Sequence, residues 1–188
     1  MIEVVNHVTL DGVMQAPGHP DEDRRGGFEH GGWAPPYADG VQGEYMGARM
    51  SSGGGALLFG RWTYDKFADV WPQRPEDDPI RQVLEQTTKY VVSRSPRSLE
   101  WENSVLLDGD AVAAVRDLEE NLVILGSGEL IRALLPHGLI DAFVLTIHPL
   151  VLGSGRRLFA DDGALAKFRL AEAKPTTTGV LIARYEAA

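Results

Sequence analysis

Three short segments place small or cationic residues at the carboxyl end of an apolar strand pattern, and in two of them a helical pattern follows. The first is Gly126-Ser127-Gly128, which follows an apolar run at residues 122–125 and precedes a helical stretch. A helix that begins in such a turn leaves backbone N–H groups and the positive end of its dipole free to hold an anion. Glycine also lets a phosphate approach the backbone without a Cβ clash. The turn therefore predicts a phosphate site, with an ordinary glycine turn before a helix as the alternative.

This turn differs from the Rossmann fingerprint. It lacks the pattern G-x-G-x-x-G, and no acidic residue follows about twenty positions later to hold a ribose. Glu129 lies in the first turn of the expected helix, where a carboxylate suits the helix dipole but is unfavourable beside a phosphate. Both interpretations of the turn stay open on these residues alone.

The second and third segments have cationic side chains at similar corners. In Gly60-Arg61-Trp62-Thr63-Tyr64, Arg61 would supply positive charge and Thr63 a hydroxyl donor to an anion. Alternatively, Thr63 caps the helix and Arg61 is a solvated surface cation. Ser93-Arg94 directly follows the strand pattern of residues 89–93. Because open α/β sheets bind ligands outside the carboxyl ends of their strands, three such corners together predict a site for an anionic ligand.

The elements that would position these corners alternate between strand and helix. Six segments have the apolar composition of strands: residues 2–9, 56–60, 89–93, 105–107, 122–125 and 140–152. Five segments read as helices from apolar spacing and from start and stop signals: residues 41–52 (capped by Asp39 and stopped by Gly53-Gly54-Gly55), a stretch from 62, then 79–87, 110–120 and 129–135. This alternation predicts a mainly parallel α/β sheet. A closing antiparallel hairpin at 168–177 and 179–186 makes the sheet mixed.

Residues 13–40 form a long segment dominated by glycine, proline and charge. An ordered loop of this length is uncommon in a compact domain and is usually functional; a mobile surface excursion is the alternative. Phe28, Trp33 and Tyr37 favour docking, because a disordered segment carries few aromatic residues.

The five histidines show no spacing typical of paired metal ligands. Within the long loop, His19 and His30 could join Asp21 and Asp23 around a hard metal ion, but a flexible polar loop is the simpler account, and we expect no metal. His148, directly before Pro149, is expected at the end of a strand.

Composition excludes several classes of protein. The 188 residues (20.5 kDa) predict one domain over residues 1–188. A net charge of −9, with no block of lysine or arginine, argues against nucleic-acid binding. The absence of cysteine excludes thiol nucleophiles, thiolate zinc sites and disulfides. The N-terminus lacks the pattern of a signal peptide, and no apolar run approaches the roughly 18 residues of a membrane helix, so a cytoplasmic location without membrane contact is expected.

Six motifs follow one another along nearly the whole chain: T-L-D-G at 9–12, G-R-x-T-Y at 60–64, K-x-V-x-S-R at 89–94, L-G-S-G-E-L at 125–130, G-L-I-D-A-F at 138–143 and H-P-L-V-L-G-S-G-R-R-L-F at 148–159. Together they resemble the dihydrofolate reductase-like group typified by the reductase domain of bacterial bifunctional riboflavin-biosynthesis deaminase-reductases. The resemblance implies a three-layer α/β/α fold with a mixed, mostly parallel sheet and a C-terminal antiparallel hairpin. It also implies NADPH as cofactor and, as is common in the family, a homodimer.

The resemblance assigns a role to each corner. Gly60, Arg61 and Thr63 would hold cofactor phosphates, and Ser93 and Arg94 would meet the 2′-phosphate that distinguishes NADPH from NADH. The residues implied under the pyrophosphate are Gly126, Ser127, Gly128, Glu129 and Leu130. The family often has two adjacent glycines where this chain has Gly126-Ser127, and the Cβ of a serine there narrows the approach.

The implied activity is NADPH-dependent hydride transfer to a pteridine, pyrimidine or similar heterocycle, as in a 5-amino-6-(5-phosphoribosylamino)uracil reductase. A dihydrofolate reductase, and a nucleotide-binding or regulatory protein without turnover, are the alternatives. The deaminase half of the bifunctional enzyme needs H-x-E and P-C-x-x-C, which a chain without cysteine lacks. Reduction of a C=N bond is helped by a proton donor. Glu44 is the nearest counterpart of the family's helix carboxylate, or else faces solvent; Asp11 contacts substrate or sets the turn with Gly12. The loop at 13–40 would cover the site.

Overall fold

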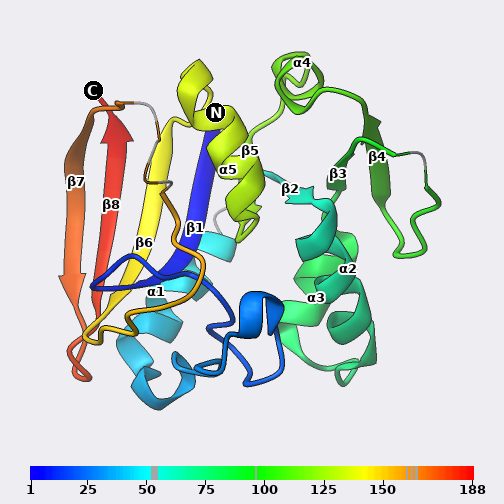
Figure 1. Ribbon diagram of the computed structural model, residues 1–188. Coiled ribbons are helices and arrows are strands. Elements are labelled where there is room, and N and C mark those ends of the chain that lie inside the picture. The colour runs from blue at the N-terminus through cyan, green and yellow to red at the C-terminus, as the bar shows by residue number, and fades with distance from the viewer. Residues whose placement is uncertain (52–54, 96, 160, 162, 164) are drawn as a thin grey trace.

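The computed structural model describes residues 1–51, 55–95, 97–159, 161, 163 and 165–188, with only the backbone of residues 50 and 51. An eight-stranded sheet crosses it in the order β4-β3-β2-β5-β1-β6-β8-β7 (Figure 1). The strands are β1 (Ile2–Thr9), β2 (Ala56–Gly60), β3 (Lys89–Ser93), β4 (Ser104–Asp108), β5 (Leu122–Leu125), β6 (Ala142–His148), β7 (Phe168–Pro175) and β8 (Leu181–Ala187).

Most neighbouring strands of the sheet are parallel. β1 pairs in parallel with both β5 and β6, and β2 pairs in parallel with β5 and β3. β4 continues the parallel part at one edge, whereas β7 and β8 form an antiparallel hairpin whose second strand pairs with β6. The predicted mixed, mostly parallel sheet with a C-terminal hairpin is confirmed.

Helices cover both faces of the sheet, which gives three layers (Figure 1). One face carries α1 (Gly40–Ser51), α2 (Arg61–Val70) and α3 (Pro79–Gln86), and the other carries α4 (Ala111–Arg116) and α5 (Gly128–Leu134). Asp39 caps α1 as predicted, because its carboxylate accepts a hydrogen bond from the backbone N–H of Gln42 at 3.0 Å. Single 3-10 turns lie at Arg25–Gly27, Pro35–Tyr37, Trp71–Gln73 and Leu135–His137.

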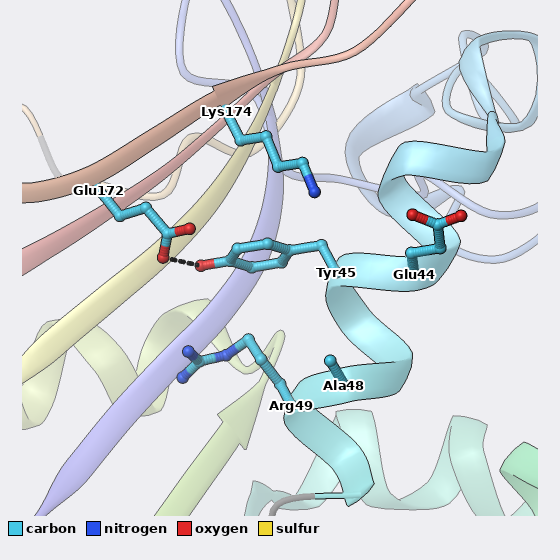
Figure 2. A pocket seen from close by; sticks show the side chains of 6 residues that line it. All are labelled: Glu44, Tyr45, Ala48, Arg49, Glu172 and Lys174. Carbon is cyan, nitrogen blue, oxygen red and sulfur yellow. Dashed lines mark hydrogen bonds between the residues drawn. The ribbon is translucent and has the colours of Figure 1, made fainter.

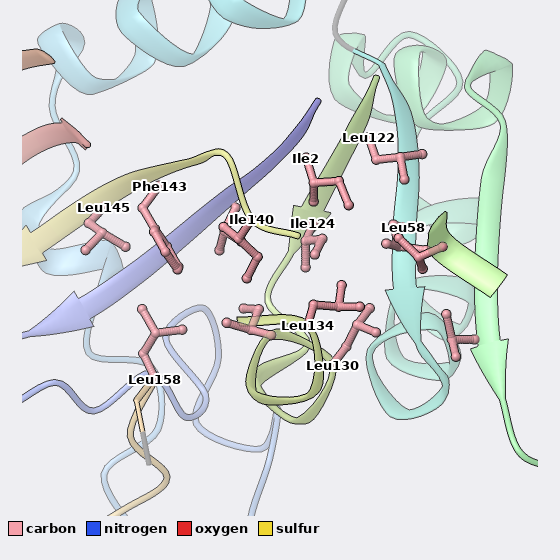
Figure 3. Packing of buried hydrophobic residues seen from close by; sticks show 14 of the residues in the cluster. Ile2, Leu58, Leu122, Ile124, Leu130, Leu134, Ile140, Phe143, Leu145 and Leu158 are labelled. Atoms are coloured by element: carbon pink, nitrogen blue, oxygen red, sulfur yellow. The ribbon is translucent and has the colours of Figure 1, made fainter. Parts of the chain in front are cut away.

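The main core lies between the sheet and α5. Val4 and Val8 point to this face because side chains alternate along β1. They belong to a cluster with Ile131 and Leu134 of α5, both of which are fully buried. Figure 3 shows Leu130 and Leu134 facing Ile124 across this layer. Burial of one such side chain contributes roughly 1.5–3 kcal/mol to the free energy of folding, so this packing holds α5 against the sheet.

Three predicted element boundaries are wrong or untested. The strand predicted at 140–152 ends at His148, because Pro149 has no N–H to donate to a ladder and Leu150 bonds instead to Leu10 outside the sheet. The helix predicted at 110–120 ends at Arg116, and Leu118 packs into the core from the turn that leads to β5. Ser52, Gly53 and Gly54, named above as part of the end and stop of α1, lie outside the described residues.

The loop at 13–40 is docked, as its aromatic residues predicted. Phe28 and Trp33 are 5% and 6% exposed and pack with Val13 and Ala16 in a small core of their own. The Trp33 indole N–H donates to the backbone oxygen of Gln15 at 2.8 Å. The Gln15 side-chain amide in turn donates to the backbone oxygens of Asp23 and Arg25. Buried hydrogen bonds of this kind hold the loop in one conformation.

Candidate functional site

A cleft of ≈ 2100 Å³ opens on the face of the sheet that carries α1 and α2 and reaches over the carboxyl ends of β2, β3 and β5. Its floor is apolar: Val5 of β1 pairs with Leu125 of β5, and Val123 pairs with Leu57 of β2. A single ligand site is usually about 300–1,000 Å³. The cleft is therefore large enough for two ligands side by side.

The two walls of the cleft are helix faces. α2 presents Thr63, Phe67 and Val70, which helical spacing brings to one side of the helix. α1 presents Met46 and Arg49. The first half of the loop at 13–40 forms the rim. The Arg25 guanidinium of this loop lies 3.9 Å from the ring centre of Trp62 at the start of α2, so the rim is attached to the wall.

All ten residues predicted to hold the cofactor line this cleft, and a hydrogen bond joins two of the corners. The Gly60 backbone N–H donates to the Ser127 hydroxyl at 2.9 Å, which connects the start of α2 with the start of α5. Ser127 is buried and adopts the left-handed conformation with φ 58° and ψ 52°. Gly126 before it also has a positive φ, of 67°, so two consecutive left-handed residues turn β5 into α5.

The rest of the α5 corner divides between cleft and core. Leu130 packs into the main core and is 5% exposed. Glu129 is exposed and forms an ion pair with Arg156, with 2.9 Å between Oε1 and Nη1. Because Arg156 neutralises the carboxylate, Glu129 repels an anion less than the sequence suggested. The backbone of Gly128 lies under the Met14 sulfur, which would be 2.8 Å from an added Cβ.

The α2 corner is open and cationic. Gly60 is the N-cap residue and no side chain caps the helix, so the alternative in which Thr63 caps it is wrong. The Arg61 side chain is 61% exposed, and its only ion-pair partner in the described residues is Asp65 at 3.8 Å. Such an exposed pair contributes little to stability, which leaves the guanidinium available to an incoming anion.

The third corner is a tight turn that presents one arginine. Ser93 is buried, and its hydroxyl both donates to the backbone oxygen of Ser95 at 2.9 Å and accepts from the Ser95 N–H. Arg94 is exposed at the end of β3. Ser93 therefore shapes the turn, and Arg94 is the side chain that extends from it.

Glu44 does not line this cleft. It is exposed on α1 and belongs to a separate small pocket at the side of the helix that faces β7. Figure 2 shows Glu44 on α1 next to Tyr45, whose hydroxyl donates to Glu172 of β7. Its assignment as proton donor stays a prediction, which this position does not favour.

Asp11 acts in the turn rather than in the cleft. Its carboxylate accepts a hydrogen bond from Thr9 and from the backbone N–H groups of Leu152 and Gly153. The Thr9 hydroxyl is the main cause that lowers the pKa of Asp11, helped by these backbone donors. An ionised carboxylate that ties two loops together fits the turn-setting alternative better than substrate contact.

Two polar residues on the cleft floor were not predicted. Glu3 is 4% exposed, and its carboxylate pairs with Arg49 and with Arg184, the latter at 3.2 Å. His7 lies on the same face of β1, and its Nδ1 is 2.9 Å from Nε2 of the fully buried His148. The alternation of β1 could have placed Glu3 and His7 on one face, but their partners come from distant segments.

Arg156 and Arg157 also line the cleft; from the sequence they could bind a substrate phosphate, lie at the surface, which was favoured, or form a dimer contact. The Arg157 Nε donates to the backbone oxygen of Asp11 at 3.0 Å, and the Arg156 backbone N–H donates to the Gln15 side chain. Because Arg156 is paired with Glu129, Arg157 and Arg61 are, of these three arginines, the two that favour an anionic ligand.

Among the described residues, no helix has the length and apolar character needed to cross a bilayer. No group of three or more histidine, aspartate or glutamate side chains there is arranged to hold a metal ion.

Comparison with known proteins adds sequence and fold relatives. A family model described as the RibD C-terminal domain matches residues 1–182. The chain is similar to the protein YyaP of Bacillus subtilis (strain 168), at 26% identity over 132 residues, which cover 66% of this chain and 70% of YyaP.

Two solved structures share the fold. A protein from Shewanella sp. PV-4 named for riboflavin biosynthesis has a TM-score of 0.69 and 21% identity and covers 100% of this chain and 98% of its own. A dihydrofolate reductase from Enterococcus faecalis, solved with NADP(H), has a TM-score of 0.60 and 13% identity, covering 100% and 96% of the two chains. These likenesses show that the fold is dihydrofolate reductase-like.

Proposed function

The chain belongs to the RibD C-terminal domain family, a family of reductase domains, and on this premise we propose that it is an NADPH-dependent reductase that transfers a hydride to a pteridine, pyrimidine or similar heterocycle. The observation that carries the proposal is that all three corners predicted to bind an anion open into one cleft. Such a cleft offers phosphate sites at one end and a flat, apolar surface for aromatic rings at the other.

The residues at the corners fit a dinucleotide phosphate. Gly60 and Gly126 present backbone without side chains, and an added Cβ at either would approach the neighbouring corner to 3.5 Å. The Ser127 hydroxyl oxygen accepts from Gly60, so its own hydrogen is free to donate to a phosphate oxygen. Arg61 adds charge. A bound NADPH would supply the hydride; the chain would supply orientation, charge and exclusion of water.

Arg94 is the residue that we assign to the 2′-phosphate. Its guanidinium is exposed at the end of β3, where a charge-assisted hydrogen bond to phosphate is worth about 1.5–3 kcal/mol. Ser93 holds the turn that presents it and is a positioning residue. Selectivity for NADPH over NADH would then depend on Arg94.

The loop at 13–40 would cover the substrate end. Met14 and Gln15 of this loop line the cleft, and the Arg25 contact with Trp62 connects the loop to the α2 wall. A cover of this kind excludes water during hydride transfer.

The test is calorimetric titration of the purified protein with NADPH and NADH, for the wild type and for Arg94→Ala. We expect tight, NADPH-selective binding and a loss of about 10- to 100-fold in NADPH affinity for the variant, with NADH unchanged. Arg116→Ala, an exposed arginine on α4 outside the cleft, is the matched control. An equal loss for both nucleotides would refute the role of Arg94.

Turnover is tested separately by screening pteridines and pyrimidines for oxidation of NADPH. A protein that binds NADPH selectively but oxidises it with none of them would be the nucleotide-binding protein without turnover. The absence of binding to either nucleotide would refute the reductase proposal itself.

A further inference from the structure

The His7–His148 pair is a buried polar unit at the carboxyl end of the cleft floor. His7 lies on the same face of β1 as Val5, two residues or roughly 6–7 Å further along the strand. Its Nδ1 is 2.9 Å from Nε2 of His148 in β6. His148 is fully buried, and Trp33 and Tyr37 of the docked loop meet its ring edge to face, with centroids 5.0 and 5.5 Å away. The ring of His7 is therefore fixed from behind.

The free nitrogen of His7 is its Nε2. No described residue bonds to this atom, and His7 lines the cleft. On the other side, His148 Nδ1 is buried without a partner among the described residues, so the pair has no other polar contact that would dictate its tautomer. One hydrogen lies between the two rings, and His7 Nε2 is a donor when His148 supplies that hydrogen and an acceptor when His7 does.

The pair is uncharged at neutral pH. Burial lowers the pKa of both His7 and His148 to about 4. A neutral imidazole nitrogen suits an uncharged polar partner such as a ring N–H or a carbonyl, whereas the phosphates of a ligand have arginines at the opposite corners.

The other polar side chains that β1 contributes to the cleft are already engaged. The Glu3 carboxylate is paired with Arg49 and Arg184, and the Asn6 side-chain amide donates to the Met14 sulfur at 3.7 Å. His7 has a ring nitrogen, Nε2, without a partner among the described residues and beside an apolar surface.

We propose that His7 is a substrate-positioning residue: its Nε2 hydrogen-bonds the N–H or C=O edge of an uncharged, flat heterocycle that lies on Val5, Leu125 and Leu57, and His148 holds the His7 ring in place. This inference rests on the proposed function, because it assumes that the substrate end of the cleft takes a heterocycle. The hydrogen-bonding edge of that heterocycle is what it adds.

The probe is lumazine, an uncharged pteridine with adjacent N–H and C=O groups, added to the cofactor-free protein labelled with 15N-histidine. We expect saturable binding and a change in the ring 15N shifts of His7 and, through the shared hydrogen, of His148. His137, exposed in the 3-10 turn that follows α5, is the internal control whose shifts stay unchanged. A lack of saturable binding, or binding that leaves the His7 shifts unmoved, overturns the inference.

Variants give the second readout. His7→Phe keeps a flat ring without nitrogen, and we expect about 10-fold weaker lumazine binding. His7→Gln places an amide near the position of Nε2 and is expected to recover most of that loss, while His137→Phe binds as wild type. If His7→Phe binds lumazine as tightly as wild type, the inference is wrong; if it does not fold, the wild-type shifts and His7→Gln decide.

NADPH titrations of the same proteins separate this inference from the proposed function. NADPH affinity depends on the corners, so His7 variants should keep it within about 2-fold. Selective NADPH binding combined with His7-independent lumazine binding would refute the positioning role alone. The absence of NADPH binding in the wild type would refute the reductase proposal.

Discussion

The Ser127 hydroxyl joins two corners that are 67 positions apart, and its replacement separates two effects that act at one residue. Ser127→Ala removes the acceptor for the Gly60 N–H, which costs about 1–2 kcal/mol when the donor is left without a partner. It keeps the Cβ in the left-handed conformation at φ 58°. Ser127→Gly removes the same acceptor but also relieves that conformation, which is worth about 1 kcal/mol. We therefore expect losses of about 1–2 kcal/mol for alanine and about 0–1 kcal/mol for glycine.

Urea denaturation of the wild type and both variants measures these free energies of unfolding. For a chain of this length, 1 kcal/mol corresponds to a shift of about 2–4 °C in Tm, so thermal melts give an independent check. Both variants should also bind NADPH more weakly, because the corners lose their connection. Wild-type stability for Ser127→Ala would show that the hydrogen bond contributes nothing. A glycine variant less stable than the alanine variant would refute the strain at this position.

Three further predictions concern stability. Burial lowers the pKa of His7 and His148 from 6.5 to about 4. Because the unfolded chain binds more protons between these values, the free energy of unfolding should fall as the pH drops from about 6.5 to 4. Urea midpoints across that range check this prediction, and a flat profile would contradict it. The ammonium of Lys89 donates to the backbone oxygens of Leu84 and Thr87 at 2.6 and 2.8 Å. Lys89→Met should therefore lower the free energy of unfolding, measured by urea titration, by about 1–3 kcal/mol. An unchanged value would show that these carbonyls find other partners. Trp33→Ala should speed trypsin cleavage within the loop at 13–40 at least several-fold over the wild type, with a smaller change in the urea midpoint of global unfolding. Equal cleavage rates for variant and wild type would show that the loop is held without its aromatic core.

The three corners could be located from the sequence because each is a local pattern. An apolar strand, a small or cationic turn and a helix start within ten residues fix where a corner lies in any parallel α/β sheet. Gly60-Arg61-Trp62-Thr63-Tyr64 and Gly126-Ser127-Gly128 were located this way, whereas Ser93-Arg94 was located only by its place after a strand, because β4 and not a helix follows it. The hydrogen bond between Gly60 and Ser127 could not be, because it depends on β2 and β5 being neighbours in the sheet.

The end of the cleft at His7 was harder to predict, because its residues come together only through the pairing of distant strands. His7 and His148 are 141 positions apart and meet only through the register of β1 with β6, in which Thr9 pairs with His148. Glu44, the residue predicted as proton donor, lies on α1 but does not line the cleft, and its role stays a prediction. Met46 and Arg49 face the cleft, and Glu44, two residues before Met46, lies roughly 200° away around the helix.

The position of β1 in the middle of the sheet has a consequence for how the protein folds. β1 is the first strand along the chain, yet both of its neighbours, β5 and β6, follow more than 110 residues later. Pairing of such distant segments closes large loops and slows folding. Until β5 and β6 emerge during synthesis, the apolar β1 has two unpaired edges, which makes it a segment prone to misassociation. Slow or chaperone-dependent folding should therefore accompany this topology, and refolding rates should respond to substitutions in β1 more than to those in the C-terminal hairpin.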